Sequence, residues 1–326
     1  MENILEVRNL IISFGDKRER YEVVSDISLN IPKGKIVCVV GESGCGKTVT
    51  ALSIMGLLPI PPGSVDSGEV VFEGTNLLEL SENELRDYRG NRLSMIFQEP
   101  ISSLNPVFTI GDQIGEALRA HKSLSKNEVN KKVIELLDLV GIPAPESRIN
   151  SYPHELSGGM CQRAMIAMAL SCDPELLIAD EPTTALDVTI QAGILNLILE
   201  LKNKIGMAVM LITHDLGIVS EIADEVYVLY AGKVVEKGSR DSIFNNPSHP
   251  YTIGLLKSIP SLRERTDSLQ SIPGYIPSPK NFPGACRFQD RCGYVFDKCR
   301  EKEPLLEEVD DSHFSACYKS KDFLHK

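Results

Sequence analysis

The segment at residues 41–48 constrains the fold of this chain more than any other stretch. Its sequence, GESGCGKT, has the pattern G-x-x-x-x-G-K-[ST] and follows the apolar run IVCVV at residues 36–40. An uninterrupted apolar run that ends at a glycine is typical of a parallel strand buried on both faces. Residues 48–58 then have apolar positions at helical spacing and stop at a cluster of prolines. A strand, a glycine loop and a helix in this order predict a loop that binds the phosphates of a nucleotide.

Each residue type in this loop has a chemical reason. Glycines let backbone N–H groups converge on phosphate oxygens, and the N-terminus of the following helix adds a partial positive charge. We expect Lys47 to reach the β- and γ-phosphates and Thr48 to ligate Mg²⁺. The predicted nucleotide contacts of the loop are Gly41, Ser43, Gly44, Cys45, Gly46, Lys47, Thr48 and Val49.

A second apolar segment, LLIA at residues 176–179, ends on the adjacent carboxylates Asp180 and Glu181. Asp180 at the end of a strand is suited to the Mg²⁺ shell, and Glu181 to orienting or deprotonating an attacking water. A single pair of this kind also occurs as surface acids at a strand end. Because it follows a phosphate loop, this pair predicts the metal side of a nucleoside triphosphatase.

The order of patterns along the chain predicts an α/β fold. Short β-branched runs and turns alternate over about the first hundred residues, and helical spacing dominates from about 81 to 171. Residues 176–179 and 208–213 have buried-strand character around a helical segment at 190–204. We therefore predict a mixed sheet with helices and an inserted helical subdomain at about 85–170. After Gly238 the chain becomes Pro-rich and polar, so we predict a nucleotide-binding domain at 1–238 and a C-terminal extension at 239–326.

Charge and hydropathy exclude several classes of protein. With 34 Lys and Arg against 45 Asp and Glu, the net charge of −11 disfavours nucleic acid and anionic lipid as partners. The apolar stretches are far shorter than the ~18 residues that a membrane-spanning helix requires. The N-terminus, MENILEVRNL, lacks the features of a secretory signal. We expect the chain to stay in the cytoplasm.

The segment LSGGM at residues 156–160 resembles the signature motif of the ABC ATPases. A lone LSGG is also a good helix start, with Ser157 as the N-cap. Here the other elements of the family follow in family order: Gln98 resembles the Q-loop, Ala185-Leu186-Asp187 the D-loop and His214 the switch histidine. The resemblance implies hydrolysis of Mg²⁺-ATP by a head-to-tail dimer, in which the signature of one subunit contacts the γ-phosphate held by the other. The residues implied are Glu181, His214 and Gln98 for catalysis, Thr48, Gln98 and Asp180 for Mg²⁺, and Ser157, Gly158, Gly159 and Asp187 for the nucleotide.

Two details of the predicted site stay undecided, one in the signature motif and one at the adenine ring. Met160 stands where the commonest signature of the family has Gln, and its thioether cannot donate a hydrogen bond as an amide can. The family also implies an aromatic ring against adenine near the N-terminus. Phe14 is the first candidate and Tyr21 the alternative, since the residues between them look inserted and either ring can equally belong to the core.

Three longer stretches, around the phosphate loop, the Q-loop and the signature, resemble the oligopeptide, dipeptide and nickel importer branch of the family. The segment SHPYT at residues 248–252 resembles the HPY element of that branch. The resemblance implies a peripheral subunit on the cytoplasmic face of the membrane. Its partners would be two permease subunits, a homologous second ATPase and an extracytoplasmic binding protein, and its cargo di- or oligopeptides. Nickel or another small solute is the alternative cargo. A soluble ABC ATPase that acts on nucleic acid or ribosomes is the alternative class, which the chain length and the charge disfavour.

Four of the eight cysteines, Cys286, Cys292, Cys299 and Cys317, lie in the extension with the spacing C-x₅-C-x₆-C-x₁₇-C. This spacing is neither that of paired zinc ligands nor that of a ferredoxin. Grouped thiols in a reducing compartment indicate a metal centre, and spacing alone ranks an iron–sulfur cluster and zinc equally, ahead of unbound thiols. The resemblance to the importer branch puts a [4Fe–4S] cluster first. Arg287, Arg291 and Lys298 are expected to offset the thiolate charge, with His313 as an outside candidate for a ligand.

Overall fold

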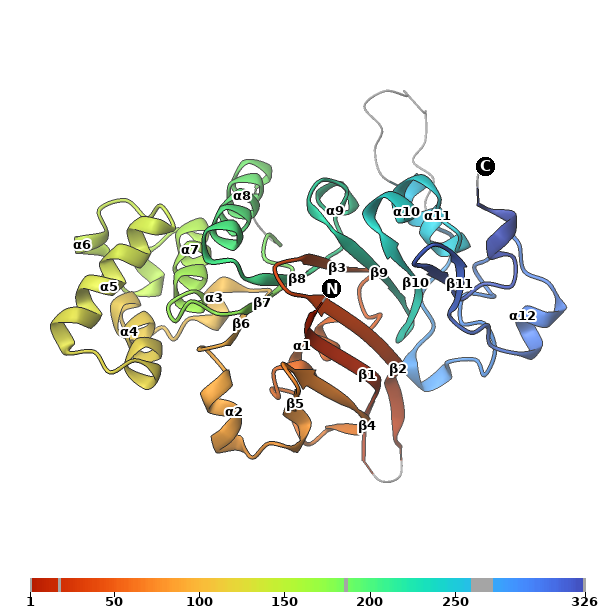
Figure 1. Ribbon diagram of the computed structural model, residues 1–326, viewed down its shortest axis with the longest axis horizontal. Helices are drawn as coiled ribbons and strands as arrows, with labels where there is room; N and C mark the ends of the chain where they lie inside the picture. The colour runs from red at the N-terminus through yellow and green to blue at the C-terminus, as the bar shows by residue number, and fades with distance from the viewer. Residues whose placement is uncertain (1, 17–18, 185–186, 259–271, 325–326) are drawn as a thin grey trace. The chain divides into compact units, whose positions relative to one another are not determined.

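The computed structural model describes residues 2–16, 19–184, 187–258 and 272–324. Its backbone separates into two compact units (Figure 1). Unit 1 comprises Met1–Ile4, Pro32–Lys35 and Glu79–Leu211, and unit 2 comprises Leu5–Ile31, Ile36–Leu78 and Ile212–Lys326. The extension therefore shares a unit with the segment that carries the phosphate loop.

Unit 1 contains a strand layer and a group of helices. Its strands follow the order β8-β7-β6, and β6 runs parallel to β7. All residues of β6 and β7 are buried, as their apolar sequences require. The strands are β6 (Leu93–Ile96), β7 (Leu176–Asp180) and β8 (Ala208–Thr213, which ends in unit 2). The helices are α2 (Glu82–Tyr88), α3 (Pro100–Ser103), α4 (Ile110–His121), α5 (Lys126–Leu139), α6 (Pro145–Arg148), α7 (Gly158–Ala169) and α8 (Val188–Ile205), with a 3₁₀ turn at Pro153–Glu155.

Helices α4, α5 and α7 pack against one another in unit 1. Helix α5 buries Val129, Val133, Leu136 and Leu137, which is the three-and-four spacing that predicted a helix here. Its start at Ser125 is a capping box, because Ser125 accepts a hydrogen bond from the Glu128 N–H and Glu128 accepts one from the Ser125 N–H. Local sequence therefore places both the buried face and the end of this helix.

Unit 2 contains two sheets. The first has the order β2-β1-β4-β5, with β4 antiparallel to both β1 and β5. In the second, the strands of this unit follow the order β11-β12-β10-β9-β3, with β3 parallel to β9 and the other pairs antiparallel. The strands are β1 (Asn3–Phe14, which begins in unit 1), β2 (Tyr21–Pro32), β3 (Ile36–Val40), β4 (Gly63–Phe72), β5 (Thr75–Asn76), β9 (Glu225–Tyr230), β10 (Lys233–Ser239), β11 (Glu307–Asp310) and β12 (His313–Ser315). The helices are α1 (Lys47–Ile54), α9 (Leu216–Ile222), α10 (Arg240–Asn245), α11 (Pro250–Lys257) and α12 (Asp297–Glu301), and 3₁₀ turns lie at Leu77–Glu79, Pro279–Asn281 and Ser320–Asp322.

The α/β class and the buried strand at 36–40 are confirmed, and two local expectations need correction. The helix after the phosphate loop ends at Ile54 rather than at Leu58, because Gly56 has a left-handed φ of 61° that stops it. The Pro-rich character of the extension predicted loops rather than long elements, and it missed the short hairpin β11–β12, which adds to the sheet at β10 with Glu236 opposite Ser315. Strands of three or four residues among prolines carry too little periodicity to be predicted.

A buried carboxylate attaches this hairpin to the sheet. Glu236 of β10 is fully buried and accepts hydrogen bonds from the N–H of Ser248 (2.6 Å), the hydroxyl of Ser248 (2.8 Å) and the N–H of His249 (3.0 Å). The His313 ring of β12 lies 2.8 Å from the same carboxylate. Burial lowers the pKa of His249 to about 4, so its ring is neutral and Nδ1 accepts a hydrogen bond from the Tyr251 N–H at the start of α11. The SHPYT segment is thus the structural junction between the sheet and the extension.

Glu236→Ala is expected to lower the free energy of unfolding by about 3 kcal/mol, because buried donors at Ser248, His249 and His313 lose their acceptor. Urea unfolding followed by circular dichroism measures the loss. Glu69→Ala, which removes an exposed carboxylate paired with Arg8, is the control and should change the midpoint little. Equal midpoints for the two variants would contradict a structural role for Glu236.

Candidate functional site

The predicted phosphate loop lies in unit 2 between β3 and α1, and two of its positions admit only glycine. Gly41 has a φ of 153°, and a Cβ there would lie 2.2 Å from the Leu229 carbonyl oxygen of the neighbouring strand β9. Gly46 has a φ of 105° and precedes the first residue of α1. A side chain at either position would displace the loop from the strand or strain its backbone. Because Gly41 lies so close to β9, the loop can lead directly from β3 into the N-terminus of α1.

The Lys47 side chain is folded into this loop. It is 5% exposed, and its Nζ donates hydrogen bonds to the carbonyls of Gly41 (2.7 Å) and Glu42 (3.1 Å). Ser43, Gly44 and Thr48 are exposed, whereas Val49 is half-buried. The first turn of α1 contains no acidic residue, so a buried ammonium group and a helix N-terminus lie together without an opposing carboxylate from that turn. This arrangement can bind an anion such as a polyphosphate.

Unit 2 also contains Cys45 and His214, which were predicted to contact the nucleotide and to take part in hydrolysis, respectively. Cys45 is buried, and burial raises the pKa of its thiol, so it serves as a small apolar side chain. Its carbonyl accepts a hydrogen bond from the Gly232 N–H at 3.0 Å. His214 follows β8 and is exposed, immediately before Asp215, which caps α9. The switch histidine implied by the resemblance thus lies at the surface, at the end of a buried strand.

In unit 1 the structure brings Gln98 and Glu181 together across 83 positions of sequence. The Gln98 amide donates a hydrogen bond to the Glu181 carboxylate at 3.2 Å, and the Thr184 hydroxyl donates another at 2.9 Å. Asp180 is 1% exposed at the end of β7, and Glu181 is half-buried with a φ of 45°. Left-handed backbone at a residue other than glycine is costly and concentrates at functional sites. Sequence reasoning missed Thr184, although it lies only three positions from Glu181.

The signature segment begins α7. The Ser157 side chain accepts a hydrogen bond from the Met160 N–H at 3.3 Å, so it is the N-cap of this helix. A Cβ on Gly158 would meet nothing within 4 Å, while one on Gly159 would lie 3.3 Å from the Ile190 side chain. Asp187 caps α8 through the Ile190 N–H at 3.0 Å. Ala185 and Leu186 of the predicted D-loop lie outside the described residues.

The two candidates for adenine stacking lie on neighbouring strands, Phe14 at the end of β1 and Tyr21 at the start of β2. Both rings are half-buried. Lys280 of the extension places its ammonium 5.4 Å from the centre of the Tyr21 ring. The choice between the two rings stays a prediction.

The four cysteines of the extension line one cavity of about 20 Å³, together with aromatic side chains. Burial, followed by the proximity of the other thiols, raises the pKa of Cys286 to about 11 and of Cys317 to about 12. Even so, within the part of the chain that the structure describes, no group of three or more His, Cys, Asp or Glu side chains is arranged to hold a metal ion. The four cysteines border the same cavity, and the metal centre stays a prediction.

The expected partners of these cysteines need correction. The Arg291 guanidinium pairs with Glu42 of the phosphate loop, and Lys298 lies against the Tyr318 ring. Burial raises the pKa of Cys292, and Lys319 is the cation whose charge opposes this shift. His313 bonds Glu236 and does not line the cysteine cavity.

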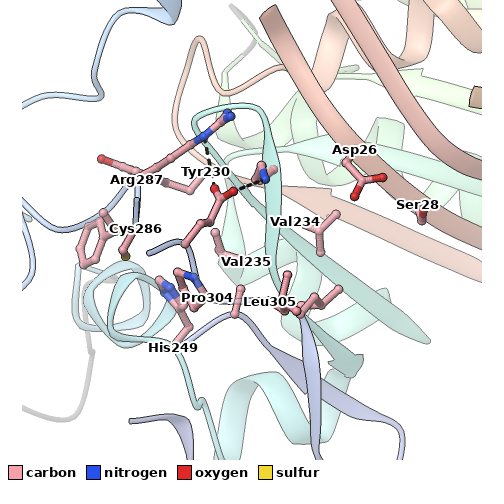
Figure 2. Close-up of a pocket in the computed structure, with 15 residues that line it drawn as sticks. Asp26, Ser28, Tyr230, Val234, Val235, His249, Cys286, Arg287, Pro304 and Leu305 are labelled. Carbon is pink, nitrogen blue, oxygen red and sulfur yellow. Dashed lines mark hydrogen bonds and ion pairs between the residues drawn. The ribbon is translucent and has the colours of Figure 1, made fainter. Parts of the chain in front are cut away.

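Cys286 also borders a larger cavity in unit 2, of about 360 Å³. Figure 2 shows the side chains that line it. Lys233 and Arg287 are both paired there with Glu303. None of the residues predicted to contact ATP lines this cavity.

Comparison with known proteins identifies the family of both parts of the chain. Residues 24–184 match the ABC transporter family, and residues 235–299 match the C-terminal region of oligopeptide/dipeptide transporters. The oligopeptide transport ATP-binding protein AppD of Bacillus subtilis is 51% identical over 306 residues, which are 94% of this chain and 93% of that protein. The dipeptide transport ATP-binding protein DppD of Escherichia coli is 48% identical over 315 residues, 97% of this chain and 96% of that protein.

Solved structures agree with this assignment. The dimeric structure of MJ0796, a bacterial ABC transporter cassette, superposes with a TM-score of 0.64 at 28% identity and covers 72% of this chain and 98% of that one. A post-hydrolysis state of the same cassette, bound to ADP and Pi, gives the same values. The chain therefore belongs to the ABC transporter family, carries the C-terminal region of its oligopeptide and dipeptide transporters, and is an ABC-type ATPase.

Proposed function

We propose that this chain is the ATP-hydrolysing subunit that energises import of di- or oligopeptides through a membrane permease. The observation that carries the proposal is the match of residues 235–299 to the oligopeptide/dipeptide transporter region, within relatives that align over nearly the whole chain. AppD and DppD are named for oligopeptide and dipeptide transport. Nickel or another small solute is the alternative cargo, because an ATPase subunit does not contact the cargo itself.

The site residues have complementary roles in this proposal. Lys47 and the backbone N–H groups of the phosphate loop hold the β- and γ-phosphates of ATP, and Thr48, Gln98 and Asp180 hold Mg²⁺. The ion, when bound, neutralises charge that develops on the phosphates. Glu181 accepts the proton of the attacking water or orients it, while Gln98 and Thr184 keep its carboxylate in place. His214 contacts the γ-phosphate.

The helix N-terminus at Ser157–Gly159 is proposed to contact the γ-phosphate held by a second subunit, with Asp187 nearby. That second subunit is proposed to be a homologous ATPase of the same transporter. Among the described helices, none combines the length and the apolar character that crossing a bilayer requires. We propose attachment to two permease subunits at the cytoplasmic face of the membrane, with an extracytoplasmic binding protein delivering the cargo. The net charge of −11 argues against nucleic acid as the partner.

We also propose a metal centre at Cys286, Cys292, Cys299 and Cys317, with a [4Fe–4S] cluster ahead of zinc. The support is that all four thiols border one small cavity, although they are separated by up to 31 positions (317 − 286). A four-thiol donor set suits either group. Its role would be structural or redox-sensing, since none of the four cysteines is among the residues assigned to ATP.

Glu181→Gln is expected to lower ATP turnover at least about 100-fold, because the amide cannot accept a proton at the attacking water. Phosphate release measures turnover, and gel filtration with ATP should show a trapped dimer. Glu200→Gln, an exposed substitution on α8 in the same unit, is the control and should retain turnover. Normal hydrolysis in Glu181→Gln would remove Glu181 from the catalytic site.

Cells lacking this chain should lose uptake of a labelled dipeptide or oligopeptide and recover it with the wild-type chain but not with Lys47→Ala, which removes the buried ammonium from the phosphate loop. Uptake of radioactive nickel, measured in the same strains, tests the alternative cargo. Loss of nickel uptake with intact peptide uptake would replace the proposed substrate, and normal uptake of both would refute the transport role.

Protein purified without oxygen should contain about four iron atoms and four sulfide ions per chain, with broad visible absorption. Cys299→Ser should remove them, whereas Cys172→Ser, a buried cysteine outside the cavity, should not. Stoichiometric zinc in place of iron would select the alternative ligand. Absence of both metals would refute the metal centre.

A further inference from the structure

The extension contacts the phosphate loop directly through an ion pair between Arg291 and Glu42. The two guanidinium nitrogens of Arg291 lie 2.9 and 3.0 Å from the two carboxylate oxygens of Glu42, which is a bidentate geometry. The Arg291 side chain is 6% exposed and that of Glu42 30%. The residues are 249 positions apart in sequence. A sheltered bidentate pair fixes both the distance and the direction of its partners, unlike a flexible surface ion pair.

Glu42 is held through its backbone as well. Its N–H donates a hydrogen bond to the Tyr251 hydroxyl at 2.9 Å, and its carbonyl accepts one from Lys47 Nζ at 3.1 Å. Tyr251 belongs to the SHPYT segment and is fully buried. Thus three residues constrain the N–H, the carbonyl and the side chain of a single loop position. Lys47 is hydrogen-bonded to the carbonyl of Glu42. A shift of Glu42 therefore also moves an acceptor of the Lys47 ammonium, the group assigned to the phosphates.

Arg291 is itself held by a backbone carbonyl and by two aromatic rings. Its Nε donates to the Pro273 carbonyl at 2.9 Å, and its guanidinium lies 5.7 Å from the centre of the Tyr230 ring and 6.0 Å from that of Phe288. The rings of Tyr230, Tyr251 and Phe288 contact one another at centroid distances of 4.6 to 5.5 Å. The same aromatic cluster therefore supports both groups that hold Glu42.

A second arginine of the extension, Arg287, contacts the loop indirectly, through the peptide group between Ala231 and Gly232. Arg287 donates hydrogen bonds to the Ala231 carbonyl and, at 2.9 Å, to the Ser25 hydroxyl. The next residue, Gly232, donates its N–H to the carbonyl of Cys45 in the phosphate loop. Figure 2 shows Arg287 and Cys286 side by side at the cavity that the extension lines. The loop is thus contacted at two positions, at Glu42 directly and at Cys45 through Gly232.

We propose that Arg291 is a positioning residue for nucleotide binding, which holds the phosphate loop in its ATP-binding conformation through Glu42. The C-terminal extension is then part of the ATP site and not only an appendage to the cassette. The proposal rests on the assignment of residues 41–48 to phosphate binding. Its physical reason is preorganisation: a loop with three glycines has many backbone conformations, and each one excluded before ATP arrives lowers the entropic cost of binding.

Arg291→Met tests the proposal, because it keeps the length of an apolar stem and removes the guanidinium. Titration with a fluorescent ATP analogue in the presence of Mg²⁺ should show a Kd raised about tenfold or more, and the KM for ATP should rise more than kcat falls. Arg291→Lys keeps the charge without the bidentate fork and should give an intermediate Kd. Thermal melting of each variant separates a change in the loop from general loss of stability.

Double substitution shows whether Arg291 acts through Glu42. Glu42→Gln alone should weaken binding, and adding Arg291→Met to it should change the Kd less than twofold further. If Arg291→Met raised the Kd by the same factor with and without Glu42→Gln, the proposed route would be wrong. A lower melting temperature with an unchanged Kd in Arg291→Met and Arg291→Lys would show a merely structural role and overturn the proposal.

Two further variants serve as references. Tyr318→Phe removes a hydrogen bond from the extension to the Lys302 carbonyl without touching residues 41–48, and should leave the Kd unchanged. Lys47→Ala should abolish binding of the analogue. If Lys47→Ala bound normally, the assignment of the phosphate loop would fail. A normal Kd in Arg291→Met beside lost binding in Lys47→Ala would refute only the role of Arg291.

Discussion

The close approach of Gly41 to the carbonyl of Leu229 is the constraint on which the nucleotide site depends. Strand β3 lies parallel to β9, and the chain leaving β3 must pass the end of β9 at a distance that admits no side chain. Only this path brings the loop straight into the N-terminus of α1 with Lys47 folded under it. The glycine at position 41 is therefore required by a backbone contact as well as by the phosphate-binding pattern.

The junction at Glu236 explains how a short, Pro-rich extension becomes an integral part of unit 2. A fully buried carboxylate is stable only when donors surround it, and here they come from the SHPYT segment and from β12. The same segment supplies Tyr251 to the phosphate loop. One short motif therefore joins the sheet, the extension and the phosphate loop.

Local features of the fold and site were predictable, and long-range pairs were not. The strand at 36–40, the loop after it and the amphipathic helix α5 follow from periodicity and capping within a few residues. The hydrogen bond between Gln98 and Glu181 was not predicted, although the family resemblance assigned both residues to catalysis. Arg291, which adjoins Cys292 in the sequence, was expected to offset the thiolate charge, whereas its guanidinium pairs with Glu42. A side chain chooses its partner in space, and sequence proximity does not decide that choice.

By itself, the sequence determined the class of fold and the chemical types at each motif, because strand and helix periods and glycine spacing are local properties, and its motifs carried the resemblance to the family. Tertiary structure decided that β11 and β12 extend the sheet, that the four cysteines border one cavity and that the extension holds the phosphate loop. These outcomes depend on which buried polar groups find partners once the chain is compact. That pairing is a property of the whole core, so no segment of the sequence contains it alone.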